Sequence, residues 1–102
     1  MVKPVENLTA LVLRLVSRSV HPRLRDWDLV TCEVVASTPV SGMDDLISPN
    51  LTGPCLSLGI RRELLHNVAL GATLHLRAKL GSSGDILAEP YPDPGDFRVE
   101  QR

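Results

Sequence analysis

Aromatic side chains are scarce in this sequence: they make up 3% of its 102 residues, with one Trp, one Tyr and one Phe. Proteins that bind single-stranded nucleic acid stack bases on aromatic rings, and each stacked base contributes about 1–3 kcal/mol. So few rings count heavily against a surface that binds bases by stacking.

Cysteine is also rare, since Cys32 and Cys55 are the only two and form no CxxC pair. Both lie in apolar, strand-like stretches, so we expect buried free thiols rather than a disulfide framework. His21, His66 and His75 add nitrogen ligands, but none of these side chains are spaced as paired metal ligands. The sequence therefore predicts no metal and no other cofactor.

Neither sign of charge dominates. The formal net charge is −1, which gives no global attraction to nucleic acid or to an anionic membrane. Arg14 and Arg18 interrupt the first long apolar run, and we find neither a targeting nor a membrane segment. We therefore expect a cytoplasmic protein that does not bind membranes.

What the chain does have is the composition of a globular protein, with 43% hydrophobic and 23% charged residues. A chain of this length is one domain in size and can bury roughly 65% of its unfolded surface. We expect residues 1–102 to form a single domain around one core.

Alternation of apolar and polar residues predicts several strands. It is clearest at 72–80, where the Gly/Ser turn 81–84 then predicts a β-hairpin. Residues 55–60 alternate in the same way, and 29–36 are rich in β-branched residues. Each of these stretches is expected to be a strand.

The stretch 8–20 fits two periodicities. Its leucines and valines match a helical stripe, while Leu11, Leu13 and Leu15 by themselves match strand alternation. We favour a strand, because β-branched and hydroxyl residues accumulate toward Val20 and the neighbouring segments need a sheet partner. If the stretch is helical, an α+β sandwich with an N-terminal helix replaces an all-β fold.

Short helical turns are expected between strands. Residues 61–67 have helix formers in too short a run for an independent helix. The loop 42–54 can hold one turn around 44–47, where Asp44 and Asp45 would suit the start of a helix.

The order of these elements is three strands, a helical turn and two further strands. This order resembles that of five-stranded Greek-key barrels of the OB type. The stretches 60–65 and 70–74 are also similar to the turn that enters the fourth strand of such barrels. We predict a mainly β fold: a small five- to six-stranded OB-like Greek-key barrel with one short helical turn.

Prolines gather in 89–96, which must be extended or turning because no regular ladder tolerates prolines at that density. We expect this segment to pack on or flank the barrel, and residues 97–99 to add a short edge strand. It could present Tyr91 to a groove on another protein, or protect a sheet edge from strand addition. We favour the protective role.

The candidate binding residues are mainly arginines. A basic stripe without an acid precedes Asp26, and it could bind phosphate or be a solvated face that pairs with Asp26, Asp28 and Glu33. Trp27 could be a binding anchor or, as we favour, a partly buried plug at the barrel end. The full set is Arg14, Arg18, Arg23, Arg25, Trp27, Arg61, Arg62, Arg77 and Tyr91.

No catalytic motif is present. His66 and several loop acids could serve acid–base chemistry, yet the chain has no nucleophile elbow, HExxH or phosphate-cradling glycine loop. We expect a non-catalytic binding or assembly module that recognises a protein partner or docks with copies of itself. Nucleic-acid binding through the arginine stripe is the second hypothesis, and a small enzyme that uses His66 is the third.

Overall fold

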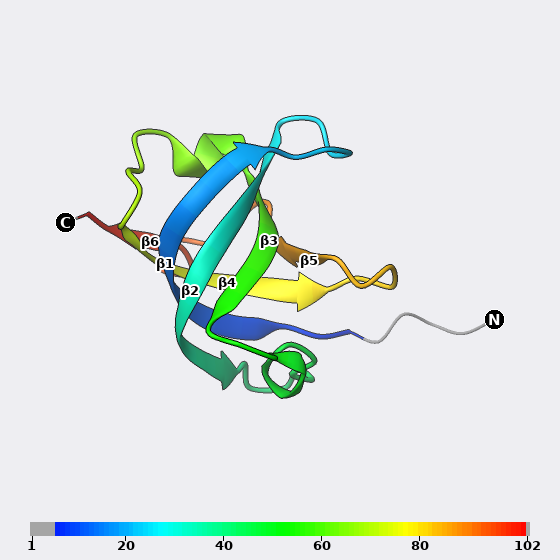
Figure 1. The fold of residues 1–102 in the computed structure, drawn as a ribbon. Coiled ribbons are helices and arrows are strands. Elements are labelled where there is room, and N and C mark those ends of the chain that lie inside the picture. The colour runs from blue at the N-terminus through cyan, green and yellow to red at the C-terminus, as the bar shows by residue number, and fades with distance from the viewer. Residues whose placement is uncertain (1–5, 102) are drawn as a thin grey trace.

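The computed structural model describes residues 6–101, which form six strands and two short 3-10 helices (Figure 1). The part of the chain described contains no α-helix, and neither helix is long and apolar enough to cross a membrane. The strands are β1 (Thr9–Val20), β2 (Trp27–Pro39), β3 (Cys55–Arg61), β4 (Thr73–Leu80), β5 (Ile86–Ala88) and β6 (Arg98–Glu100), and the helices are η1 (Ser48–Asn50) and η2 (Arg62–Leu65).

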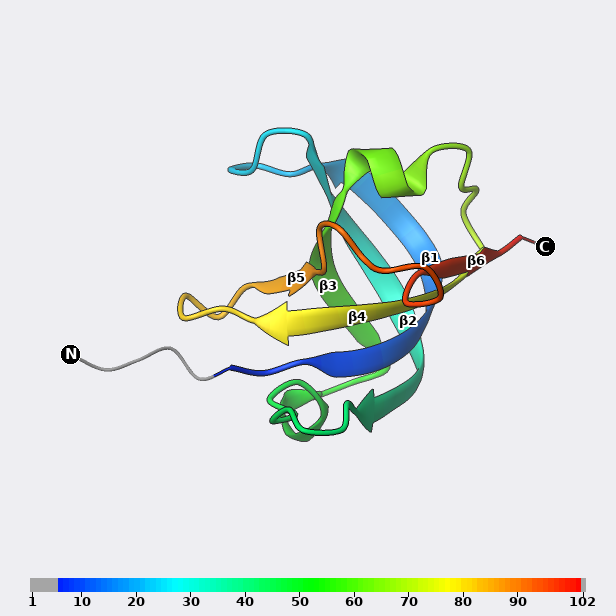
Figure 2. The ribbon, with the colours of Figure 1, turned by 180° about the vertical axis from the view of Figure 1, so that it is seen from behind.

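The sheet closes on itself. Its strand order is β1-β2-β3-β5-β4, and β4 pairs with β1 again to complete a barrel. The β3–β5 contact is parallel and the other pairings are antiparallel, so the barrel is mixed. Strand β6 is an extra strand, which pairs with β4 beyond the end of β5 (Figure 2). The expectation of a mainly β, compact single-domain barrel is confirmed.

Strand β1 is long enough to belong to two sides of the barrel. It pairs with β2 along its length, and residues 9–14 also pair with β4. The β1–β2 pairing shifts register between Val12 and Leu13 and again between Leu15 and Ser17. Such irregularities allow a strand to curve around a closed sheet. Leu11, Leu13 and Leu15 all face the core, so the strand expected here is confirmed and the helical alternative is wrong.

The core is built from aliphatic side chains, which explains why so few aromatic residues suffice. Leu74, Leu76 and Ala78 on β4 are buried at two-residue spacing and pack against the leucines of β1. Phe97 is only half-buried and packs against this cluster from outside. The alternation seen in the sequence therefore separates core from surface correctly.

The helical turns differ in part from the expectation. Helix η2 lies within 61–67 as expected, but the loop after β2 has its turn at η1, immediately after 44–47 rather than within it. Asp45 accepts hydrogen bonds from the backbone N–H groups of Ile47 and Ser48, at 3.1 and 2.9 Å, and so turns the chain just before the helix. One helical turn was too few, because η1 forms a second turn in this loop, directly after the backbone bonds that Asp45 accepts.

The same carboxylate fastens the loop to the barrel. The Thr9 hydroxyl, buried at the start of β1, donates a hydrogen bond of 2.6 Å to Asp45. Burial opposes ionisation of Asp45, but hydrogen bonds from Ser48, Thr9 and the backbone outweigh it, so the pKa of this carboxyl lies below its usual value.

The two thiols differ in environment. Cys32 is buried as expected, whereas the expectation for Cys55 is wrong: its side chain is exposed because it begins β3 opposite the exposed Glu33. Burial, together with the neighbouring Cys55 thiol, raises the pKa of Cys32 to about 12.

Only the thiolate attacks a disulfide reagent, so we expect Cys55 alone to react rapidly in the folded protein at about pH 8, and both thiols to react after denaturation. Titration with an aromatic disulfide reagent measures this difference. Cys55→Ser is the control and should leave no fast-reacting thiol. Equal rates for both thiols in the native protein would contradict the buried position of Cys32.

Candidate functional site

The outer face of β1, β2 and β3 carries two neighbouring rows of uncharged residues. Directly opposite residues of an antiparallel ladder point to the same side of the sheet. We call the two rows the hydroxyl face; the first contains Ser17, Thr31 and Ser57, and the second contains Ser19, Leu29 and Gly59. The residues between these positions along the strands, such as Val30 and Leu58, are buried in the core.

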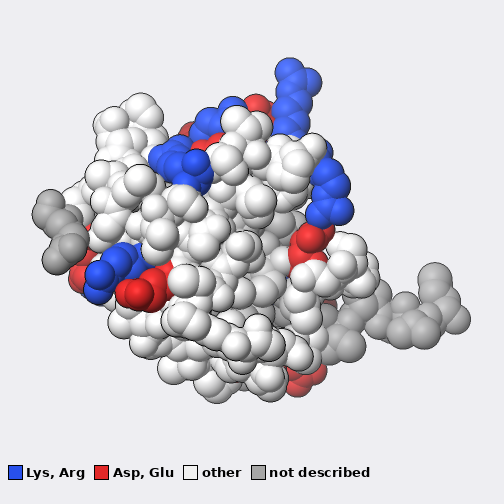
Figure 3. Space-filling model, in the orientation of Figure 1, with Lys and Arg blue, Asp and Glu red and all other residues white. Residues whose placement is uncertain are grey.

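Charged residues border the hydroxyl face without entering it. On one side the next row holds Arg14 and Glu33, whose charged groups are 3.7 Å apart. On the other side Trp27 pairs with Arg61. Figure 3 shows the middle of this surface, over β2 and β3, free of basic and acidic atoms, with charged side chains toward the edges. The Thr31 and Ser57 hydroxyl oxygens lie 3.4 Å apart near its centre.

One end of the hydroxyl face is closely packed around Gly59. A Cβ at this position would lie 2.7 Å from a δ-carbon of Leu87 and 3.3 Å from both His21 and Trp27. Trp27 is half-buried and lies against the outer side of β3, while Asp28 is the residue buried at this end of the barrel. The indole is therefore packed by its own neighbours and offers only part of its surface to a partner.

Residues 21–26, the loop that joins β1 to β2, are held in place by a buried imidazole. Nδ1 of His21 accepts hydrogen bonds from the backbone N–H groups of Arg23 and Leu24, at 3.1 and 3.0 Å. Asp26 has a φ of +66°, and its carbonyl accepts a bond of 2.9 Å from the backbone N–H of Arg62. The loop is thus tied both to itself and to η2.

Asp28 is the electrostatic centre of this end of the barrel. Its side chain is buried and accepts hydrogen bonds from Arg18, at 2.7 and 3.2 Å, and from Arg62, at 3.0 Å. Burial alone would raise the pKa of Asp28, but the two guanidinium groups outweigh it and lower this pKa below its usual value of 3.8. Arg18 also donates to the Leu65 carbonyl, so it anchors η2.

Most of the remaining candidate arginines contact acids. Arg23 forms an ion pair with Asp85, Arg77 lies 3.5 Å from Asp96, and Arg61 pairs with Glu63. Arg14 pairs with Glu33 and Arg18 pairs with Asp28, as expected if the stripe is a solvated face. Asp26, the third acid expected to pair with the stripe, forms no ion pair with these arginines. Among the described arginines of the stripe, Arg25 is the one without an acidic partner.

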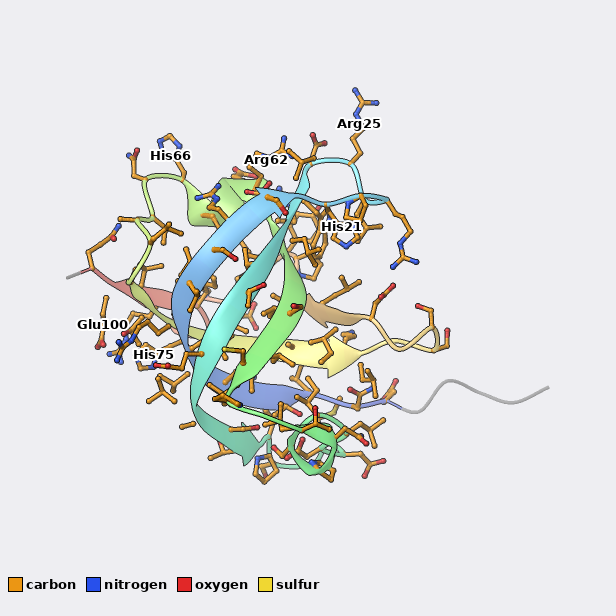
Figure 4. The ribbon with its side chains drawn as sticks, viewed as in Figure 1. His21, Arg25, Arg62, His66, His75 and Glu100 are labelled. Carbon is orange, nitrogen blue, oxygen red and sulfur yellow. The ribbon has the colours of Figure 1, made fainter. Side chains whose placement is uncertain are left out.

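The loop 21–26 and η2 enclose two adjoining hollows, of about 400 and 450 Å³, that share Asp26 and Arg62 as lining residues. Figure 4 shows Arg25, Arg62 and His66 along this edge of the molecule, with Arg25 projecting away from the barrel. Arg14 and Arg77 line neither hollow. The predicted arginines therefore lie on different parts of the surface and do not form a single site.

The Pro-rich segment contacts the barrel through two arginines. Arg61 donates a hydrogen bond of 2.9 Å to the Pro90 carbonyl, and its guanidinium lies 4.4 Å from the centre of the Tyr91 ring. Arg77 reaches Asp96 near the other end of the segment. Tyr91 itself is 79% exposed, so the segment is held by its backbone and by one face of the ring.

In residues 6–101 there is no group of three side chains that could hold a metal ion. Comparison with protein-family models, with curated proteins and with solved structures found no match. The functional proposal therefore rests on the surfaces described above.

Proposed function

We propose that this barrel is of the OB type, with Greek-key connections. The strand order, the parallel β3–β5 contact and the position of η2 between β3 and β4 support this assignment. Barrels of this type bind ligands on the face of strands 2 and 3, between the loops 1–2 and 4–5. In this chain those loops are 21–26 and 81–85, and the Arg23–Asp85 ion pair joins them.

The protein acts as a non-catalytic module that binds a protein partner through the hydroxyl face. The observation that carries this proposal is the lack of charge over the first row, on three strands, and over Ser19 and Leu29 of the second row, whose Gly59 is buried. The centres of protein interfaces are depleted in charged residues. Small Ser and Thr side chains offer adaptable hydrogen bonds, as they do in antibody combining sites. Val16, exposed on β1 immediately before Ser17, adds apolar area.

The partner's contact surface is itself largely uncharged, because an acidic or basic partner would lose solvation on this face without gaining an ion pair. This distinguishes the proposal from nucleic-acid binding, which needs arginines free to contact phosphates. Arg14, Arg18 and Arg23 of the arginine stripe already contact acids. We also propose that the protein acts in the cytoplasm, because the free thiols of Cys32 and Cys55 are compatible with that reducing compartment.

Ser57→Arg tests the proposal, because it places a long charged side chain in the centre of the hydroxyl face without altering the core. Ser41→Arg is the matched control, since it makes the same change in the exposed turn after β2. Wild type and both variants are used to capture proteins from nuclease-treated extract at low and moderate salt, with quantification by mass spectrometry. We expect a protein that wild type and Ser41→Arg recover equally at both salts and that Ser57→Arg recovers at least about ten-fold less.

If every captured protein is recovered equally by Ser57→Arg and Ser41→Arg, the hydroxyl face is not the contact surface. Light scattering of the purified protein tests a second copy of this chain as the partner: a dimer that Ser57→Arg dissociates and Ser41→Arg does not would identify it. A parallel capture from extract without nuclease tests the alternative: nucleic acid recovered there at low salt only, with no protein that meets the criterion, would favour the arginine stripe instead.

A further inference from the structure

The two hollows beside the hydroxyl face have a different chemistry. They adjoin at Asp26 and Arg62, which line both hollows, between the loop 21–26 and η2. We call the pair of hollows the basic groove. Its charged lining consists of four arginines and two acids, namely Arg23, Arg25, Arg61, Arg62, Asp26 and Glu63, and the histidines His21 and His66 also line it.

The positive charge of this groove is only partly neutralised from within the protein. Arg62 and Arg18 share the single carboxylate of Asp28, which is buried beneath them. The side chain of Arg62 also donates to the Trp27 carbonyl, at 3.3 Å, but it is 46% exposed and lines both hollows. Arg25 adds a guanidinium with no acidic partner among the described residues.

From this arrangement we infer that the basic groove binds an acidic peptide segment, whose carboxylates are held by Arg25 and Arg62 with His66 as a further donor. Guanidinium groups bind carboxylates in planar, paired hydrogen bonds, so both arginines suit this ligand. Two adjoining hollows that share lining residues suit a peptide segment of several residues better than a single small anion.

An acidic peptide fits the groove better than a single-stranded nucleic acid. Base recognition needs rings on which bases stack, and neither hollow is lined by an aromatic residue. Asp26 and Glu63 in the lining would repel a continuous phosphate backbone, whereas a peptide can place backbone amides or a basic side chain beside them. This inference does not depend on the hydroxyl face, because the two surfaces share no residue.

Arg25→Glu tests the inference, because the Arg25 side chain forms no hydrogen bond or ion pair with another described residue and its replacement leaves the Asp28 network intact. Arg14→Glu is the matched control, since it changes the global charge by the same amount on another part of the surface. The probe is a fluorescein-labelled octapeptide of glutamate, and binding is followed by fluorescence anisotropy at low and moderate salt. We expect binding to wild type that weakens with salt, a loss of about ten-fold or more in Arg25→Glu and a change below about two-fold in Arg14→Glu.

Ser57→Arg should bind the octapeptide as wild type does, which separates this site from the proposed protein-binding face. Equal losses in Arg25→Glu and Arg14→Glu would mean that the peptide responds to overall charge and that the groove is not a site. No binding to wild type at low salt would overturn the inference, as would tighter binding of a single-stranded octathymidylate than of the peptide.

Discussion

Asp28→Asn is expected to lower the free energy of unfolding by about 2–3 kcal/mol. The substitution removes the charge that two guanidinium groups share at a buried position, where only 4% of the residue is exposed. Loss of one partner of a buried ion pair costs about 3–5 kcal/mol, and we expect less because Arg18 and Arg62 are 30% and 46% exposed and can turn to water. Chemical denaturation followed by the fluorescence of Trp27, the sole tryptophan, measures the change.

The same substitution should also change the pH dependence of stability. The pKa of Asp28 is lowered in the folded protein, so its stabilising effect is present above its unfolded value of 3.8 and is lost as pH falls through the folded value. We expect wild-type stability to fall below about pH 4, with each such group contributing at most about 1.4 kcal/mol per pH unit. Asp28→Asn should show a shallower fall, with the remaining slope due in part to Asp45, whose pKa is also lowered.

Glu33→Gln is the control for this experiment, because it removes an exposed carboxylate from a wide ion pair with Arg14. Its expected cost is below about 0.5 kcal/mol. Equal effects of Asp28→Asn and Glu33→Gln, or an unchanged acid slope in Asp28→Asn, would show that the Asp28 network does not stabilise this end of the barrel.

Gly59→Val is expected to destabilise the protein by about 2–3 kcal/mol. The new Cβ would lie 2.7 Å from Leu87 and 3.3 Å from His21 and Trp27, and the valine methyl groups would reach further into these rings. The Leu87 side chain can rotate away, but His21 is fixed by its bonds within the loop 21–26. A red shift of the Trp27 emission should therefore accompany the loss of stability, since the indole must leave its place over β3.

Gly53→Val provides the comparison, because nothing lies within 4 Å of a Cβ at this exposed position. We expect its effect to stay within about 0.5 kcal/mol, with unchanged Trp27 emission. If Gly59→Val left both stability and emission at the wild-type values, the close packing of Leu87, His21 and Trp27 over β3 would be wrong.

The sequence predicted the candidate arginines as a group but not their separate roles. Asp28 bonds Arg18, 10 residues away, and Arg62, 34 residues away, and no local spacing indicates that one carboxylate serves both. The hydroxyl face was missed for a related reason. Ser17, Thr31 and Ser57 each occupy an outward position of a strand, and the signal was present in that alternation, but their alignment in one row depends on register.

By itself, the sequence determined that most of these stretches are strands and which of their central side chains face the core, whereas it left 8–20 open between a strand and a helix. The alternation of β4 is an example, because successive side chains of any strand point to opposite faces. Only the tertiary structure decided the partners: the return of β4 to β1, the exposure of Cys55 and the adjacent rows on the outer face. The two-residue period of a strand determines on which face of the sheet a side chain lies, but it does not determine the register between neighbouring strands. That register depends on the irregularities in the β1–β2 ladder, on side-chain contacts such as that of Asp45 with Thr9 and on barrel closure, all of which join residues far apart in the chain.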